Sequence, residues 1–179
     1  GALCESLGID CDAIIRGLRS FTADDNPGRG NLYDIGGVKV LVDFAHNPDA
    51  FGAIVNLASN LDANRRLIAF GEAGDRTDAL IRDLATNAWK LRPDRIITLE
   101  VEKYARGRGR GEIEMLLHER FTELGAGREQ LRHHETEMDA LKDALDWARP
   151  GDLVIMLSLA EREAVLDYLQ SAKSQERRG

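Results

Sequence analysis

The sequence predicts an α/β protein with a Rossmann-like open sheet, mostly parallel, helices on both faces and one antiparallel hairpin strand at an edge. Strand and helix patterns alternate from residue 31 onward, as successive βα units of a parallel sheet do. The strands are short, nearly continuous apolar runs, which is typical of strands covered on both faces. Gly36-Gly37 lies between two such runs and predicts a tight hairpin turn with positive φ.

Hairpin strands are expected at residues 31–35 and 38–44, because they flank the two glycines, and the second stretch is apolar enough to be a buried central strand. Apolar residues then recur at alternating helical and extended spacing. The predicted helices cover residues 50–61, 77–91, 112–124, 138–148 and 160–171, and the predicted strands cover residues 67–70, 95–99, 130–133 and 153–157. Residues 130–133 are expected to form an edge strand, because this stretch is short and polar.

The sequence divides into four segments. Residues 1–21 carry a helical pattern that is too short for a domain, and residues 22–30 are rich in turn-forming residues and predict a linker. Residues 31–173 hold the alternating pattern. Residues 174–179 form a polar tail that we expect to be frayed.

Composition restricts the class of protein. A formal net charge of -7 argues against a nucleic-acid partner, because phosphate backbones are bound by massed Lys and Arg. No apolar run approaches the ~20 residues of a membrane span. The opening residues lack a basic segment followed by an apolar one, so we expect a cytoplasmic protein. Cys4 and Cys11 are expected to be reduced core residues.

Asp43, His46 and Asn47 follow the first long strand, and ligands of open parallel sheets bind at the carboxyl ends of the strands. A carboxylate there can accept hydrogen bonds from ribose hydroxyls, and His46 and Asn47 can donate to a phosphate or a base. The alternative is structural: Asn47 caps the next helix, Pro48 occupies its first turn and His46 is a surface residue. Spacing alone favours the structural interpretation.

Two further strand ends carry candidate residues. Gly74-Asp75-Arg76 opens a helix, where free N–H groups and a guanidinium suit an anion, although an ordinary strand-to-helix turn explains the motif equally well. Arg106, Arg108 and Arg110 alternate with glycines before Glu112. This loop either binds a carboxylate-bearing ligand through forked guanidinium groups or is a flexible, solvated loop that rests against nothing.

Other kinds of site have little support. His133-His134 has no partner at metal-ligand spacing, so no metal site is predicted. Neither the Gly-x-x-x-x-Gly-Lys-Ser/Thr phosphate loop nor the Gly-x-Gly-x-x-Gly fingerprint occurs in the chain. A nicotinamide-dependent oxidoreductase would therefore rest on fold analogy alone.

Three motifs in order resemble the C-terminal domain of the Mur ligase family: Asn26-Pro27-Gly28-Arg29, Asp43-Phe44-Ala45-His46-Asn47-Pro48 and Gly74-Asp75-Arg76. The resemblance covers nearly the whole chain, and residues 1–21 are similar to the closing helices of the family's central ATPase domain. It implies an ATP-dependent enzyme that joins an amino acid to a carboxylate through an acyl phosphate. The phosphate loop, and most of the magnesium site, would belong to the central domain that is absent from this chain, which alone is expected to be inactive.

The resemblance also implies residue roles. Arg29 would reach the ATP phosphates, Asp43 would hold the ribose, and His46 and Asn47 would line the nucleotide side of a closed cleft. Arg29 and Arg76 would stabilise charge as phosphate leaves. Asp75 and Arg76 would face the incoming amino acid, with the loop residues Arg106, Arg108, Arg110 and Glu112.

The sequence departs from the family pattern at two positions. Phe44 stands where members commonly have Tyr, so a polar role of that hydroxyl is in doubt here. Members that add diaminopimelate or lysine commonly carry Gly-Lys-Gly-His-Glu after the last strand, whereas this chain has Met156–Glu161. The alternative to a ligase is a non-catalytic nucleotide-binding or assembly module of the same fold. The amino acid and the oligomeric state are left open.

Overall fold

The computed structural model describes residues 2–20, 26–100, 102–158 and 160–176, and it confirms the predicted fold class. Six strands form one sheet in the order β1-β2-β6-β3-β4-β5. The strands are β1 (Asn31–Ile35), β2 (Val38–Asp43), β3 (Arg66–Gly71), β4 (Arg95–Leu99), β5 (Leu131–His134) and β6 (Leu153–Leu157). The helices are α1 (Ala2–Ser6), α2 (Cys11–Ser20), α3 (Pro48–Ser59), α4 (Asp78–Trp89), α5 (Glu112–Glu123), α6 (Glu137–Trp147) and α7 (Arg162–Glu176), with short 3₁₀ turns at Glu102–Tyr104 and Arg128–Gln130.

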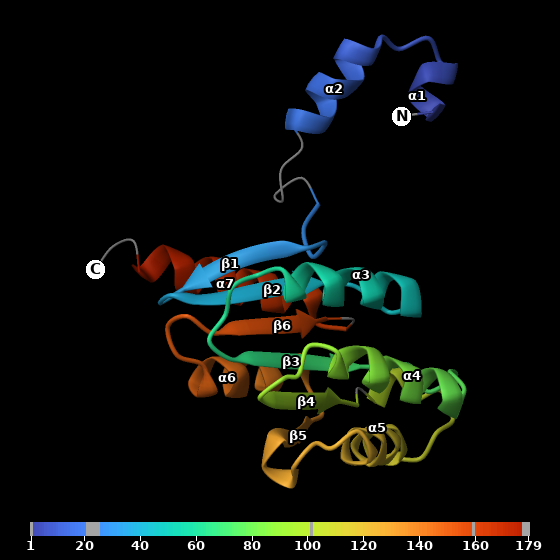
Figure 1. Cartoon of the computed structure of the whole chain (residues 1–179), viewed down its shortest axis with the longest axis vertical. Coiled ribbons are helices and arrows are strands. Elements are labelled where there is room, and N and C mark those ends of the chain that lie inside the picture. The colour runs from blue at the N-terminus through green and yellow to red at the C-terminus, as the bar shows by residue number, and fades with distance from the viewer. Residues whose placement is uncertain (1, 21–25, 101, 159, 177–179) are drawn as a thin grey trace.

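The hairpin strand β1 pairs antiparallel with β2, and every other pairing in the sheet is parallel. Gly36 and Gly37 have φ values of 58° and 79°, which confirms the predicted turn. Strand β6 lies between β2 and β3 (Figure 1), with Val154 opposite Val40 and Ile155 opposite Ile68. The carboxyl ends of β2, β6, β3 and β4 therefore share one edge of the sheet.

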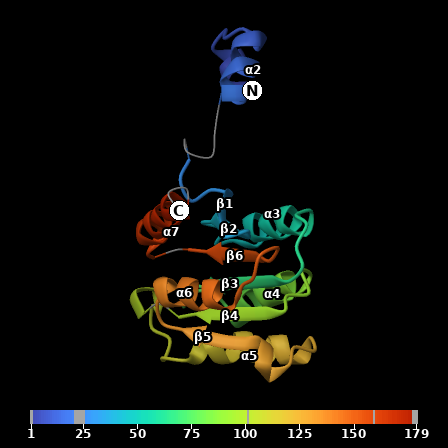
Figure 2. The same cartoon turned by 90° about the vertical axis from the view of Figure 1, so that its left-hand side faces the viewer.

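Helices cover both faces of the sheet. Figure 2 shows α3 and α4 on one side of the strands and α6 and α7 on the other. Phe51, Phe70 and Phe121 pack edge-to-face in the first layer, with ring centroids 5.2 Å and 6.0 Å apart in succession. The second layer is aliphatic and includes Leu141 and Leu169. Burial of these residues between helices and sheet is the main stabilising contribution to the domain.

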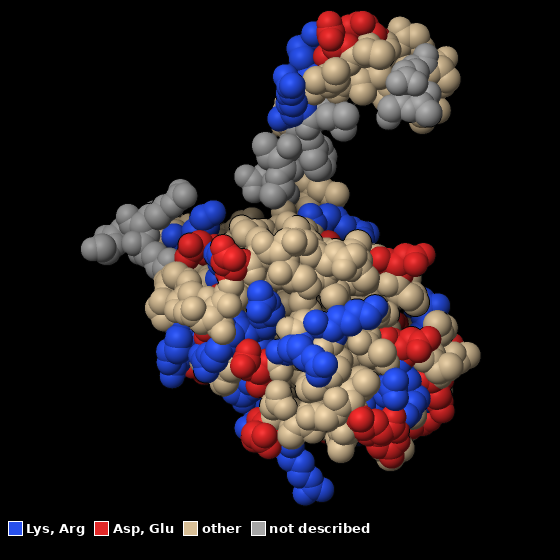
Figure 3. All heavy atoms as spheres, viewed as in Figure 1, with Lys and Arg blue, Asp and Glu red and all other residues tan. Residues whose placement is uncertain are grey.

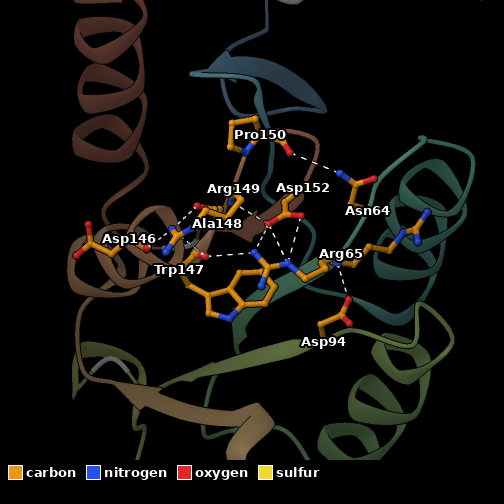
Figure 4. Close-up of polar contacts among 10 residues, drawn as sticks. Asn64, Arg65, Asp94, Asp146, Trp147, Ala148, Arg149, Pro150 and Asp152 are labelled. Carbon is orange, nitrogen blue, oxygen red and sulfur yellow. Dashed lines mark hydrogen bonds and ion pairs between the residues drawn. The ribbon is translucent and has the colours of Figure 1, made fainter.

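A polar cluster connects the amino end of β3 to the amino end of β6 (Figure 4). The Arg65 side chain donates to the Asp152 carboxylate, with Nε 3.1 Å from Oδ2, and stacks 4.0 Å from the centre of the Trp147 ring. Asp152 is 1% exposed and also accepts from the Arg149 N–H. Burial raises the pKa of Asp152, but the Arg65 and Arg149 hydrogen bonds outweigh it and hold the pKa below its ordinary value. The cluster lies at the end of the sheet opposite the predicted site.

The terminal segments differ in detail from the expected boundaries. α1 and α2 lie apart from the sheet in Figure 1, with Leu3 and Leu7 exposed, and residues 21–25 of the predicted linker lie outside the described residues. α7 continues to Glu176, so the helix includes part of the expected tail, and residues 177–179 are not described. Cys4 and Cys11 are free thiols, but Cys4 is half-buried and Cys11 is exposed, so the expectation that they lie in the core is wrong.

The surface carries charges of both signs. On the face shown in Figure 3, basic side chains are interspersed with acidic and uncharged ones. No helix in the described part of the chain has the length and apolar character needed to cross a membrane.

Candidate functional site

Asp43 lies at the carboxyl end of β2, where the linker folds back over the strand. Its side chain is 8% exposed, and Oδ2 accepts a hydrogen bond of 2.7 Å from the Gly30 N–H. The end of the neighbouring strand β6 contacts the same residue, because the Ser158 N–H donates to the Asp43 carbonyl at 3.1 Å. Burial raises the pKa of the Asp43 carboxyl, while the Gly30 N–H and the charge of Arg29 act to lower it. The linker thus places Arg29 beside Asp43.

Phe44 is an aromatic surface between the predicted nucleotide residues. The guanidinium carbon of Arg29 lies 4.9 Å from the centre of the Phe44 ring, and the His46 ring centre lies 5.0 Å from it at an angle of 55°. His46 Nδ1 is 3.0 Å from the Phe44 carbonyl oxygen, which fixes the orientation of the imidazole. Arg29, Asp43 and His46 are therefore brought together, as the sequence predicted.

Asn47 caps α3. Its side-chain oxygen accepts from the Ala50 N–H at 2.9 Å, and Pro48 occupies the first turn of the helix. The structural interpretation of this residue is confirmed for the oxygen atom. The amide NH₂ group is not needed for the cap, so the predicted role toward a nucleotide rests on that group.

The Gly74-Asp75-Arg76 turn is held against the loop that follows β4. The Gly74 N–H donates to the Tyr104 carbonyl at 2.8 Å, and a Cβ at Gly74 would overlap the Ala105 carbonyl oxygen. This close approach explains why a glycine is needed at this position. Arg76 is partly exposed at the helix entrance, with Nε 3.8 Å from Glu72 Oε1.

The arginines of the second loop bind protein groups. Arg108 donates to the Gly74 and Arg76 carbonyls at 2.8 Å and 2.6 Å, and it pairs with Asp78 and Glu112 at 2.7 Å and 3.0 Å. The loop therefore connects β4, α4 and α5. The alternative of a flexible loop that rests against nothing is therefore wrong. The sequence alone could not exclude it, because the carboxylates that surround the loop come from other elements.

Arg106 and Arg110 are also paired with carboxylates. Arg106 binds Asp75, which holds the pKa of the Asp75 carboxyl below its ordinary value, and Arg110 binds Glu135. Glu135 and two other acidic residues line a cavity of about 460 Å³ beside this loop, so the loop is less basic than its sequence suggested. The cavity is lined by Glu100, Glu102, Ala105, Arg108, Arg110, His133, Glu135 and Thr136.

The predicted residues form two groups, and a carboxylate that the sequence analysis missed connects them. Glu72 at the end of β3 is 6% exposed and accepts from the Ala73 N–H at 2.8 Å. Burial raises the pKa of Glu72, while that N–H and the electrostatic interactions with Arg76 and His46 act to lower it. Glu72 thus faces residues of both groups. The sequence feature that could have identified Glu72 is its position directly after an apolar strand.

A second missed residue is Arg162, the first residue of α7. Its guanidinium carbon lies 5.7 Å from the centre of the Phe44 ring. Nothing in its sequence neighbourhood indicates this contact, because Arg162 and Phe44 are far apart in the chain.

His133 lies in a small polar cluster without metal-ligand geometry. His118 Nε2 and His133 Nδ1 lie 3.0 Å and 3.1 Å from the Thr98 hydroxyl, and burial lowers the pKa of His118. Within the described ranges, no group of three or more His, Cys, Asp or Glu side chains could hold a metal ion.

The parallel sheet, with polar side chains gathered at the carboxyl ends of β2, β3, β4 and β6, defines an α/β ligand-binding domain. The family model described as Mur ligase, glutamate ligase domain, matches residues 28–158, and the chain belongs to the Mur ligase family. The matched relatives in this family are ATP-dependent amide ligases, and the predicted family is confirmed.

Within the family, the arginine–glycine loop and the Pro150–Ile155 stretch resemble cyanophycin synthetase, and the comparisons agree. Cyanophycin synthetase of Synechocystis is 32% identical over 163 residues, which cover 88% of this chain and 18% of that protein. Its counterpart in Crocosphaera subtropica is 32% identical over 170 residues, 92% of this chain and 18% of that protein. The chain thus spans about a fifth of these relatives.

Solved structures show the same fold. The UDP-N-acetylmuramate–alanine ligase of Thermotoga maritima has a TM-score of 0.67 at 16% identity, covering 98% of this chain and 36% of that one. The MurF ligase of the same organism, solved with ADP, has a TM-score of 0.62 at 18% identity, covering 98% and 37%. Folylpolyglutamate synthase of Mycobacterium tuberculosis, solved with ADP and AMPPCP, has a TM-score of 0.59 at 22% identity, covering 89% and 35%.

Proposed function

We propose that this chain completes the ATP- and amino-acid-binding site of an ATP-dependent amide ligase similar to cyanophycin synthetase, and closes over an acyl-phosphate intermediate. The observation that carries the proposal is the contact between the linker and the end of β2. The Gly30 N–H binds Asp43 Oδ2 at 2.7 Å, and Arg29, an exposed residue, stands beside this carboxylate. This arrangement fits a ribose and a phosphate of one nucleotide.

In this proposal Asp43 accepts hydrogen bonds from the ribose hydroxyls, and Arg29 binds the phosphates. His46 and the Asn47 amide face the base side of the same cleft. The ADP-bound state of the related MurF ligase supports the choice of nucleotide. Magnesium would be held mainly by the central domain, because the described part of this chain gathers no set of three metal ligands.

Arg76 and Asp75 would face the reacting centre, and the loop from Arg106 to Glu112 would position the amino acid. ATP supplies the phosphoryl group that activates the carboxylate as an acyl phosphate. The amine then attacks the acyl carbon, the new C–N bond forms, and the bond to the phosphate oxygen breaks. Arg29 and Arg76 would stabilise the charge that develops on the leaving phosphate, and closure of the domain would exclude water from the acyl phosphate.

The proposal is tested by Asp43→Ala in the full-length enzyme. Loss of the ribose contact is expected to raise the KM for ATP about tenfold or more, as the loss of a charge-assisted hydrogen bond does. Asp167→Ala, which removes an exposed carboxylate on α7, is the matched control and should change neither KM nor turnover.

Unchanged ATP kinetics in the Asp43→Ala enzyme would contradict the ribose assignment. A full-length protein that binds nucleotide through Asp43 and forms no amide bond with any amino acid would point instead to a non-catalytic nucleotide-binding module.

A further inference from the structure

Two guanidinium groups converge on the ring of Phe44. Arg29 approaches from the linker at 4.9 Å and Arg162 approaches from the start of α7 at 5.7 Å, each measured from guanidinium carbon to ring centre. Within the described part of the chain, neither side chain donates a hydrogen bond, and neither lies within 4.0 Å of a carboxylate oxygen. The two like charges therefore share one ring without a direct ion pair, and the Asp43 carboxylate acts on Arg29 from beyond 4.0 Å.

Eight other arginines in the described part of the chain are balanced by carboxylates, namely Arg65, Arg76, Arg82, Arg95, Arg106, Arg108, Arg110 and Arg120. Two carboxylates near the pair accept backbone hydrogen bonds. Asp43 accepts from the Gly30 N–H, and Glu161 Oε2 accepts from the Glu137 and Met138 N–H groups.

The position of Arg162 is specified by its surroundings. A Cβ at Gly28 would lie 2.5 Å from Arg162 Cδ, so the glycine of the linker makes room for the arginine stem. Gly28 has a φ of 77°, which also favours glycine. A hollow of about 440 Å³ lies beside the guanidinium and is lined by Phe44 and by residues 160–164.

We propose that Arg162 and Arg29 form a two-arginine phosphate site, with the Phe44 ring between them. A guanidinium binds phosphate oxygens through two parallel N–H groups, and its flat face rests on an aromatic ring without using those donors. Two such groups suit a multiply charged phosphate better than a singly charged carboxylate. This proposal rests on the proposed function in one respect: the expected source of the phosphate is the nucleotide whose ribose Asp43 holds.

The test is an NMR titration of the 179-residue chain that follows the arginine Nε–H resonances. The ligands are adenosine, ADP, tripolyphosphate and acetate. We expect ADP and tripolyphosphate to shift the Arg29 and Arg162 resonances. Arg162→Gln should weaken ADP and tripolyphosphate binding about tenfold and leave adenosine binding unchanged, since only the phosphate contact is lost. Arg162→Lys should restore part of the affinity, because it keeps the charge and loses the fork.

Arg92→Gln is the matched control. Arg92 also stands over an aromatic ring, 5.4 Å from Trp89, and has no carboxylate within ion-pair distance in the described residues. This variant should bind every ligand as the wild type does. Thermal unfolding of both variants shows whether a change in affinity comes from loss of fold.

The outcomes separate this proposal from the proposed function. Equal ADP affinity in the wild type and in Arg162→Gln overturns the phosphate site, as does a shift of Arg162 by acetate but not by tripolyphosphate. If the phosphate site is overturned in this way, the nucleotide site is still supported when Asp43→Ala abolishes adenosine binding. Tripolyphosphate binding that depends on Arg162, without any adenosine binding, supports the phosphate site and counts against the ribose assignment.

Discussion

At the scale of single residues, Asp152 shows how a buried charge contributes to the fold. The carboxylate accepts from Arg65 and from the Arg149 N–H, so removing the charge leaves these donors without an adequate acceptor (Figure 4). Asp152→Asn is expected to lower the free energy of unfolding by about 2–3 kcal/mol at pH 7. Urea unfolding measures this difference, and Asp146→Asn, at an exposed residue in the last turn of α6, should change stability by less than about 0.5 kcal/mol.

The effect of Asp152 depends on pH with a definite sign. Its folded-state pKa lies below the ordinary value. The stabilisation is therefore fully present above the unfolded-state pKa of about 3.9 and is lost as the pH falls through the folded-state pKa. The difference between wild type and Asp152→Asn should shrink as the pH falls below about 4. A difference that stays constant down to pH 2 would mean that the charge is not what stabilises the fold.

At the same scale, the two residues that the sequence analysis missed have a common property. Glu72 matters because it lies between His46 and Arg76, and Arg162 matters because it reaches Phe44. Both relations depend on which strands are neighbours, and no pattern of spacing in the sequence contains that information. Asp43 could be predicted because it directly follows its own strand.

At the scale of elements, Asn47 combines a structural and a proposed binding role in different atoms. Asn47→Ala removes the cap on α3 and is expected to lower stability by about 1 kcal/mol. Asn47→Asp keeps an oxygen for the Ala50 N–H and should change stability by less than about 0.5 kcal/mol. Both variants lose the amide donor, so both should bind ADP more weakly. Urea unfolding and ADP titration measure the two effects separately.

Thr77→Ala serves as the control for Asn47, because Thr77 caps α4 through a 3.3 Å contact with the Leu80 N–H. It should lower stability without changing ADP affinity. Wild-type ADP affinity in Asn47→Asp would show that the amide group does not reach the ligand and that capping is the whole role of the residue.

The elements themselves were largely predictable, since the strands Arg95–Leu99 and Leu153–Leu157 have the expected bounds and the helices differ by a few residues. Apolar periodicity is a local property, so it identifies local structure well. The arginine loop was harder to interpret. Its charge pattern suggested a basic surface, but Asp75, Asp78 and Glu135 come from other elements and neutralise it.

At the scale of the whole molecule, the insertion of β6 between β2 and β3 creates the site. It brings the start of α7, and with it Arg162, next to the linker that precedes β1. The linker before β1 and the start of α7 therefore meet around Phe44 at the carboxyl edge. The alternation of strands and helices predicts a parallel sheet, but it does not specify the order of the strands in that sheet. Long-range packing sets this order.

The last prediction concerns what the 179-residue chain does alone. It contains no Gly-x-x-x-x-Gly-Lys-Ser/Thr phosphate loop, so the proposed site has Arg29 and Asp43 without the backbone cradle that holds the β- and γ-phosphates in enzymes of this kind. The chain is expected to bind ADP and to release no phosphate from ATP above the uncatalysed rate, whereas the full-length ligase releases it in the presence of both substrates. A phosphate-release assay on the two proteins checks this. Release by the chain alone that Asp43→Ala abolishes would contradict the prediction, because it would place a complete catalytic site within these residues.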